Sequence, residues 1–202
     1  MIVTRRPPDD LRSAVLTLPN LISAFRIVLV PFFVLAVLDG RTGRALLIFF
    51  IAGISDLLDG FTARLFHVRS RLGMLLDPAG DKLLMTASYI VLTLPSIARP
   101  NAIPLGLTAL VFLRDILIVV GALIAFRLWR QTAFPPSLLG KLSTAFQVGT
   151  VFLVLLLNDL GRAPGWMIIF YAMAIFFTVA SGADYFIYGL KVLREHRNRP
   201  AA

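Results

Sequence analysis

The chain has 202 residues, of which 58% are hydrophobic and only 15% are charged, and this composition excludes an ordinary soluble domain. The net charge of +9 would suggest nucleic-acid binding in a soluble protein, but in a membrane protein it predicts basic loops that fix the topology and meet anionic lipid. We therefore expect membrane lipids as partners and no nucleic acid. The chain contains no cysteine, which excludes disulfides and thiol chemistry.

Six long apolar segments predict an all-α membrane protein with six transmembrane helices. The segments run over about residues 21–38, 45–66, 72–94, 105–126, 138–157 and 166–190. Residues 1–18 are mixed and charged and predict a short amphipathic helix at the membrane surface, ended by Pro19 and Asn20. We expect no cleavable signal there. We expect residues 191–202 to form a basic cytoplasmic tail. Because the sequence contains no internal repeats, we expect one domain over residues 1–202.

The distribution of Lys and Arg predicts the topology. With both termini in the cytoplasm, the loops on the opposite side carry only Arg41, Arg44, Arg99 and Arg162 of the 20 basic residues. Most of the others then lie in the ends and the inner loops, as the positive-inside rule requires. We therefore expect a multi-pass integral membrane protein with both termini cytoplasmic, of the kind found in a bacterial-type inner membrane.

Four aspartates stand close together in this apolar chain: Asp56, Asp59, Asp77 and Asp81. On helices, spacings of three and four residues put each pair on one face, with about 5–6 Å between Cβ atoms. Two like charges about 6 Å apart repel by about 3 kcal/mol at an effective dielectric of 20. The short loop between the two helices makes them antiparallel neighbours, so we expect the four carboxylates to share a polar cavity near the cytoplasmic face.

A cavity with four carboxylates requires a bound cation. Oxygen-only ligands favour Mg²⁺ first and Mn²⁺ or Ca²⁺ next, and a pair of such ions commonly clamps a phosphoryl group during in-line displacement. Arg64, one turn beyond Asp59, would add a fixed fork for phosphate oxygens. Gly60 and Gly73 would let a base or a phosphate approach the backbone, although tight helix packing also favours glycine in membranes. Helix-end charges that reach into water are the alternative for the aspartates, which four at these spacings disfavour.

The whole stretch resembles the signature of the CDP-alcohol phosphotransferase family. That signature reads D-x-x-D-G-x-x-A-R, then eight residues, then G-x-x-x-D-x-x-x-D. Every fixed position is present here at the same spacing: Asp56, Asp59, Gly60, Ala63, Arg64, Gly73, Asp77 and Asp81. The segments PNLISAFR, GKLSTAFQ and SGADYFIYG also resemble the lipid-synthesising branch of the family, so the resemblance covers most of the chain.

The resemblance implies six helices around a polar cavity open to the cytoplasm, in a homodimer. It implies two bound Mg²⁺ or Mn²⁺ ions, held by Asp56, Asp59 and Asp77 with a contribution from Asp81. The donor, CDP-diacylglycerol, would bind through its diphosphate to the ions and to a second set of residues: Asp59, Gly60, Ala63, Arg64 and Gly73. Asp81 would deprotonate the acceptor hydroxyl, which attacks the lipid-side phosphorus and expels CMP.

Two branches of the family resemble the wider chain, and they differ in the acceptor. Some phosphatidylglycerophosphate synthases carry Arg-Glu where this chain has Arg114 and Asp115, and a second arginine where it has Ala122. The CMP-forming cardiolipin synthases resemble this segment better, and also the closing pattern of Ser181, Tyr185, Tyr188 and Gly189. The resemblance therefore favours phosphatidylglycerol as acceptor and leaves glycerol 3-phosphate as the alternative.

Five residues are candidates for binding the acceptor: Arg114, Lys141, Arg127, Asn20 and Arg26. Arg114 has the alternative role of pairing with an acid inside the bundle, and Lys141 that of lying among lipid head groups. We expect Asp115 to pair with an arginine rather than to catalyse.

Two other classes of membrane protein also use acidic residues. In membrane prenyltransferases the acidic motifs lie much farther apart than they do here. In ion transporters the binding sites usually lie deep in the bilayer between broken helices, whereas these aspartates lie at predicted helix ends. Both alternatives are therefore disfavoured.

Overall fold

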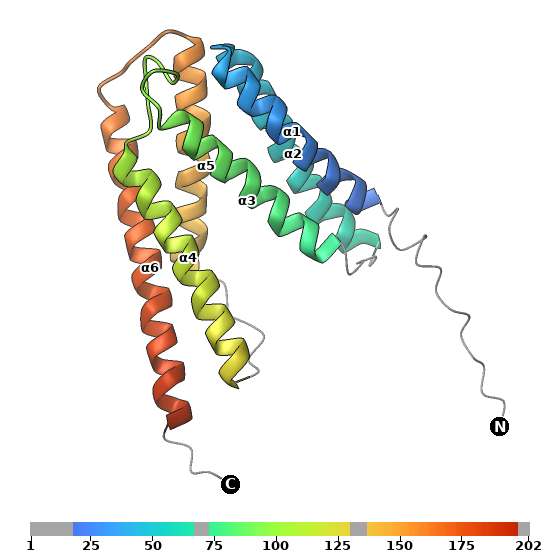
Figure 1. Cartoon of the computed structure of the whole chain (residues 1–202), viewed down its shortest axis with the longest axis vertical. Helices are drawn as coiled ribbons and strands as arrows, with labels where there is room; N and C mark the ends of the chain where they lie inside the picture. Colours follow the sequence, from blue (N-terminus) through green and yellow to red (C-terminus); the bar gives the residue numbers. More distant parts are fainter. Residues whose placement is uncertain (1–17, 67–72, 130–136, 198–202) are drawn as a thin grey trace, which may run out of the picture. The chain divides into compact units, whose positions relative to one another are not determined.

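The computed structural model describes residues 18–66, 73–129 and 137–197 (Figure 1). These residues form six helices: α1 (Leu18–Leu38), α2 (Thr42–Phe66), α3 (Gly73–Leu92), α4 (Leu105–Trp129), α5 (Leu138–Asp159) and α6 (Met167–Arg197). No strand occurs in the described part of the chain. The prediction of an all-α fold with six long helices in these places is confirmed.

Two of the observed helix ends differ from the predicted ones because the helix extends there beyond the apolar segment. Helix α1 begins at Leu18 and takes in Pro19 and Asn20, because proline is tolerated in a first helical turn where its missing N–H has no partner to lose. Helix α6 continues through the basic segment to Arg197, beyond the predicted end at Leu190. The predicted surface helix at the N-terminus falls on residues 1–17, which lie outside the described residues.

The chain divides into two compact units, Met1–Val91 and Leu92–Ala202, and each is considered by itself. The first contains α1, α2 and nearly all of α3, and the second contains α4, α5 and α6. The expectation of one functional domain over residues 1–202 stays a prediction.

A tight turn joins α1 to α2 in the first unit. Gly40 has a φ of +69°, in the left-handed region where a side chain would be strained. Its N–H bonds to the carbonyl of Val37, and the N–H of Arg41 bonds to that of Ala36. This pair of bonds is a Schellman cap, and it ends α1 so sharply that the chain reverses within a few residues.

Helices α1 and α2 pack along a stripe of small and aromatic side chains. Phe33 and Val37 of α1 and Ala45, Phe49 and Ala52 of α2 are buried. The Phe33 and Phe49 rings are 6.2 Å apart between centroids. Spacings of four and seven residues place these side chains on one face of each helix, so the sequence pattern itself specifies the packed face.

A pair of asparagines closes one end of the second unit. The Asn101 N–H and its side-chain amide donate to the Asn158 Oδ1 at 2.8 and 2.9 Å. The Asn158 amide returns a bond to the Asn101 carbonyl at 2.9 Å, and Asn101 also donates to the Arg162 carbonyl at 2.7 Å. The Tyr171 hydroxyl donates to the Ala102 carbonyl. The loop before α4 is thereby fastened to the end of α5 and the start of α6.

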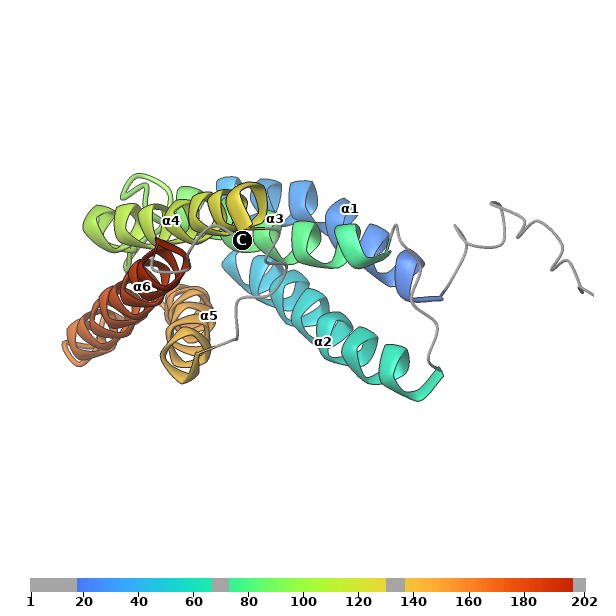
Figure 2. The same ribbon diagram turned by 90° about the horizontal axis from the view of Figure 1, so that it is seen from below.

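Helix α6 packs against both α4 and α5 (Figure 2). Its contact with α5 contains a buried polar group in which Ser143 and Thr178 share a hydrogen bond and Gln147 donates to both hydroxyls. The stacked rings of Phe146 and Phe177, 4.8 Å apart, lie on the same contact. Paired hydroxyl and amide groups of this kind hold helices together in an apolar solvent.

The outer surface of the helices carries large apolar side chains. Among those more than half exposed are Phe32, Leu47, Leu113, Ile116, Ile168 and Phe186. Soluble monomers rarely expose so many large apolar side chains. Among the described residues, two helical segments are long and apolar enough to cross a membrane, Leu138–Asp159 and Met167–Leu190. Shorter apolar stretches lie in α1, α2 and α3, and six spans stay a prediction.

Candidate active site

The acidic motif lies on two helices, at the end of one and the beginning of the next. Asp56 and Asp59 fall in the C-terminal part of α2, which runs unbroken from Thr42 to Phe66. Asp77 and Asp81 fall in the first turns of α3, which begins at Gly73. The predicted helical spacing of both pairs is therefore confirmed for the backbone. The structure describes the backbone of the four aspartates but not their side chains.

The other positions of the motif lie on the same two helices. Gly60, Ala63 and Arg64 belong to the last two turns of α2, and Gly73 is the first residue of α3. Side-chain details at these positions lie outside the described residues. Among the residues whose side chains are described, no three His, Cys, Asp or Glu lie together as metal ligands would.

Arg26 is a charged residue inside the contact between α1 and α2. It is 1% exposed and lies seven residues before Phe33, on the same face of α1. Phe33 is level with Phe49. In an antiparallel hairpin, seven residues back along α1 correspond to seven residues forward along α2, which is position 56. The register thus brings the buried arginine to the level of Asp56.

The remaining acceptor candidates lie on three different helices. Asn20 lies in the first turn of α1, and its side chain lies outside the described residues. Lys141 is exposed in the first turn of α5, and Arg127 is exposed in the last turn of α4. Arg127 follows Arg114 by thirteen positions, about 20 Å along a helix. The two arginines therefore cannot bind one small anion together.

Arg114 of α4 is held by several side chains within the second unit. Its Nη1 contacts Asp115 Oδ1 at 2.9 Å, and its Nη2 donates to the Ser181 hydroxyl on α6 at 3.1 Å. Its guanidinium carbon lies 5.9 Å from the centre of the Tyr185 ring, within cation–π range. The side chain is 11% exposed. The expected pairing of Asp115 with an arginine is confirmed.

Tyr185 also touches the first turn of α5. A side-chain carbon at Gly140 would lie 3.2 Å from the Tyr185 hydroxyl and 3.2 Å from Ser137 Oγ. Ser137 caps α5 by accepting a hydrogen bond from the Gly140 N–H at 3.0 Å. Gly140 therefore leaves the space in which the tyrosine hydroxyl fits, and Tyr185 links Arg114 to the turn that carries Lys141.

Sequence reasoning identified Arg114 and Lys141 but gave Ser181 and Tyr185 no role in a site. Their spacing of four residues puts them on one face of α6, and this was the only sequence feature that could have indicated a shared role. Which residue of α4 meets that face depends on how the two helices are rotated, and the sequence pattern of α4 does not specify this.

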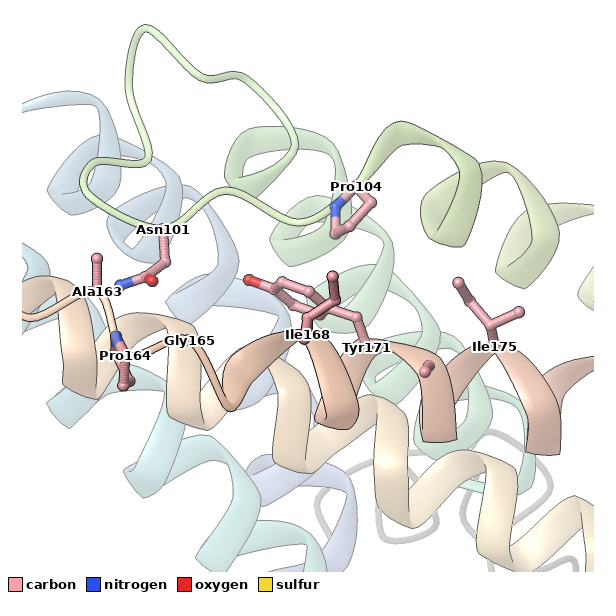
Figure 3. Close-up of a pocket in the computed structure, with 9 residues that line it drawn as sticks. Asn101, Pro104, Ala163, Pro164, Gly165, Ile168, Tyr171 and Ile175 are labelled. Carbon is pink, nitrogen blue, oxygen red and sulfur yellow. The ribbon is translucent and has the colours of Figure 1, made fainter.

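A groove of about 460 Å³ lies beside the start of α6 (Figure 3). Its lining includes Asn101, Pro104, Pro164, Ile168, Tyr171 and Ile175. Asn101 is bonded to Asn158 at the C-terminal end of α5, whereas Gly140 and Tyr185 meet at its N-terminal end. The groove therefore lies at the other end of the second unit from the Tyr185 contact.

Comparisons with known proteins show which proteins the sequence is similar to. Residues 16–180 match the family model described as CDP-alcohol phosphatidyltransferase. The chain is 37% identical over 164 residues to a "Cardiolipin synthase (CMP-forming)" of Streptomyces coelicolor, covering 76% of this chain and 69% of that protein. It is 30% identical over 197 residues to the human protein of the same name, covering 88% of this chain and 63% of the human one. It is also 28% identical over 180 residues to an Aquifex aeolicus "CDP-diacylglycerol--glycerol-3-phosphate 3-phosphatidyltransferase", covering 88% of this chain and 98% of that protein.

Proposed function

The chain belongs to the CDP-alcohol phosphatidyltransferase family and is a phosphatidyltransferase, and from this premise we propose that it makes cardiolipin. The donor is CDP-diacylglycerol, the acceptor is phosphatidylglycerol, and the second product is CMP. The complete acidic motif, at the end of α2 and the beginning of α3, carries the proposal. The names of the Streptomyces and human relatives support the choice of acceptor.

The donor set of the motif fits a pair of Mg²⁺ or Mn²⁺ ions. Helix α2 is unbroken around Asp56 and Asp59, and helix α3 is unbroken around Asp77 and Asp81, so each aspartate pair shares a helical face. Carboxylate oxygens are the ligands that such ions prefer. Asp56, Asp59 and Asp77 would hold the ions, with Asp81 contributing. When bound, the ions would neutralise the diphosphate of the donor.

The side chains of the motif then have different roles in the transfer reaction. Arg64 binds the diphosphate through paired N–H groups, and the small residues Gly60, Ala63 and Gly73 leave room for the nucleotide. Asp81 takes the proton from the acceptor hydroxyl. The freed oxygen forms a bond to the lipid-side phosphorus, the bond from that phosphorus to the oxygen of CMP breaks, and CMP leaves with its electron pair.

The exposed apolar surface and the membrane-length helices support a multi-pass arrangement. We infer that all six helices cross a bacterial-type inner membrane and that both termini lie in the cytoplasm. The catalytic cavity then opens on the cytoplasmic side, where CTP-derived donors are found. The protein acts as a homodimer in this proposal.

Glycerol 3-phosphate is the second candidate acceptor. The Aquifex relative, whose printed name includes glycerol-3-phosphate, is matched over 98% of its length. Arg114 and Lys141 supply positive charge for a phosphomonoester. The ion-transporter alternative has no such support, because the family match covers residues 16–180.

A competition assay distinguishes the two acceptors. Purified protein in detergent micelles receives labelled CDP-diacylglycerol, Mg²⁺ and equal concentrations of phosphatidylglycerol and glycerol 3-phosphate. We expect cardiolipin as the labelled product. Phosphatidylglycerophosphate as the main product would establish the second acceptor instead, and the absence of both would reject the proposed activity.

A further inference from the structure

We propose that Ser181 and Tyr185 are positioning residues that orient the Arg114 guanidinium toward the phosphate of the acceptor. The proposal rests on the proposed function, since it assigns this arginine to the second substrate. The acidic motif and Arg64 account for the diphosphate of the donor. Phosphatidylglycerol and glycerol 3-phosphate each bring one further phosphate, and Arg114 is a cation in the middle of an apolar helix, where charge commonly marks function.

The guanidinium retains donors for a ligand. An arginine has five N–H donors, and the structure accounts for one from Nη1, to Asp115, and one from Nη2, to Ser181. Its Nε is buried and has no hydrogen-bond partner among the described residues. Asp115 stabilises the charge in the absence of substrate without using all the donors, so a phosphate oxygen can be added to the existing contacts.

Two contacts from α6 fix how the guanidinium is turned. Ser181 is fully buried, and its hydroxyl oxygen accepts from Nη2, so it defines the direction of one edge. The Tyr185 ring lies beside the guanidinium carbon at 5.9 Å and limits movement on that side. Ser181 and Tyr185 are one helical turn apart, so a rigid element sets both contacts.

Gly140 sets the place of the tyrosine in turn. A methyl group there would lie 3.2 Å from both the Tyr185 hydroxyl and Ser137 Oγ. Ser137 is held by its capping bond to the Gly140 N–H, so the tyrosine is the group that would move. A side chain at residue 140 would therefore shift the tyrosine that packs beside Arg114.

The test compares substitutions in this cluster by their effect on each substrate separately. We expect Ser181→Ala to raise the KM for the acceptor about tenfold, as the loss of one hydrogen bond to a charged group implies, with the KM for CDP-diacylglycerol unchanged. Ser181→Thr, which keeps the hydroxyl, should restore the acceptor KM. Tyr185→Leu and Gly140→Ala should act in the same direction as Ser181→Ala.

The control is Ser143→Ala, because Ser143 is equally buried and its hydrogen bonds go to Thr178 and Gln147. It should leave both KM values unchanged. Calorimetric titration of the detergent-solubilised protein with each acceptor gives a second readout that needs no turnover, and Ser181→Ala should weaken that binding by the same factor.

The outcomes separate the two proposals. If the wild-type protein forms no lipid product, the proposed function fails, and the titrations of wild type and Ser181→Ala still decide whether Ser181 supports binding of a phosphate-bearing acceptor. If the wild-type protein is active but Ser181→Ala and Tyr185→Leu leave acceptor KM and acceptor binding unchanged, the positioning role is rejected. An equal rise in both KM values would also reject it, because it would indicate a general loss of structure.

Discussion

The rings of Phe33 and Phe49 lie 6.2 Å apart across the hairpin of α1 and α2, and this contact fixes the level at which the two helices pass. Arg26 on α1 and Asp56 on α2 are each seven residues further from the turn, so these two positions also lie at the same level. Arg26 is almost completely buried, and a buried guanidinium is stable only with a compensating charge. The hairpin therefore places a fixed positive charge at the level of the first aspartate of the motif.

We predict from this register that Arg26→Gln makes folding dependent on Mg²⁺. Removing one partner of a buried pair costs about 3–5 kcal/mol, so the melting temperature in EDTA should fall, and Mg²⁺ should restore most of it by neutralising Asp56. Thermal unfolding followed by far-ultraviolet circular dichroism, which reports on all the helices, measures the effect. The exposed Arg44 provides the control, since Arg44→Gln should change neither value. An equal loss with and without Mg²⁺ would show that Arg26 does not compensate the acidic motif.

Asp81→Asn should abolish transfer while leaving binding of CDP-diacylglycerol largely intact. The amide keeps the size of the side chain and a ligand oxygen, but it cannot accept the proton of the acceptor hydroxyl. Turnover and Mg²⁺-dependent binding of the donor are measured on the same preparation. Near wild-type turnover would remove Asp81 as the base.

Arg64→Ala should weaken binding of the donor more than it slows the bound complex. A charge-assisted contact to a phosphate is worth about 1.5–3 kcal/mol, which corresponds to a rise of at least about tenfold in the KM for CDP-diacylglycerol. Arg41→Ala, in the turn that precedes α2, is the matched control. An unchanged KM in Arg64→Ala would place the diphosphate elsewhere.

Asn158→Ala should destabilise the second unit without altering the chemistry. It removes the acceptor for two Asn101 donors and the donor to the Asn101 carbonyl, and each buried group left unpaired costs about 1–3 kcal/mol. We expect a lower melting temperature with unchanged KM values in the protein that remains folded. Arg162→Ala should be neutral, because Asn101 bonds to the backbone carbonyl of Arg162 and not to its side chain. A neutral Asn158→Ala would show that the loop before α4 is held by other contacts.

The sequence predicted the helices well because each one is an apolar run bounded by charged or turn-forming residues, such as the Asp39 and Gly40 turn. It predicted the helix ends less well at Pro19 and at Arg197. The first turn of α1 accepts a proline, and the last turns of α6 accept basic residues, so neither residue type ends the helix. The helical spacing of Asp56 with Asp59 and of Asp77 with Asp81 followed directly from the sequence. The roles of these aspartates in metal binding and catalysis stay predictions.

The surroundings of Arg114 could be predicted only in part. Its pairing with Asp115 involves adjacent residues and was anticipated. Its contacts with Ser181 and Tyr185 join positions 67 and 71 residues away, and they depend on the rotation of α6 against α4. The groove beside Tyr171 likewise depends on how a loop folds back over α6, which local sequence patterns do not specify.

CMP release from CDP-diacylglycerol by the purified protein tests the central claim, a metal-dependent site built by the ends of α2 and α3, most directly. We predict that CMP and cardiolipin form in equal amounts only when Mg²⁺ and phosphatidylglycerol are both present, and that Asp56→Asn on α2 and Asp77→Asn on α3 each abolish the reaction. Undiminished CMP release and cardiolipin formation in EDTA, or in either of these two variants, would contradict it.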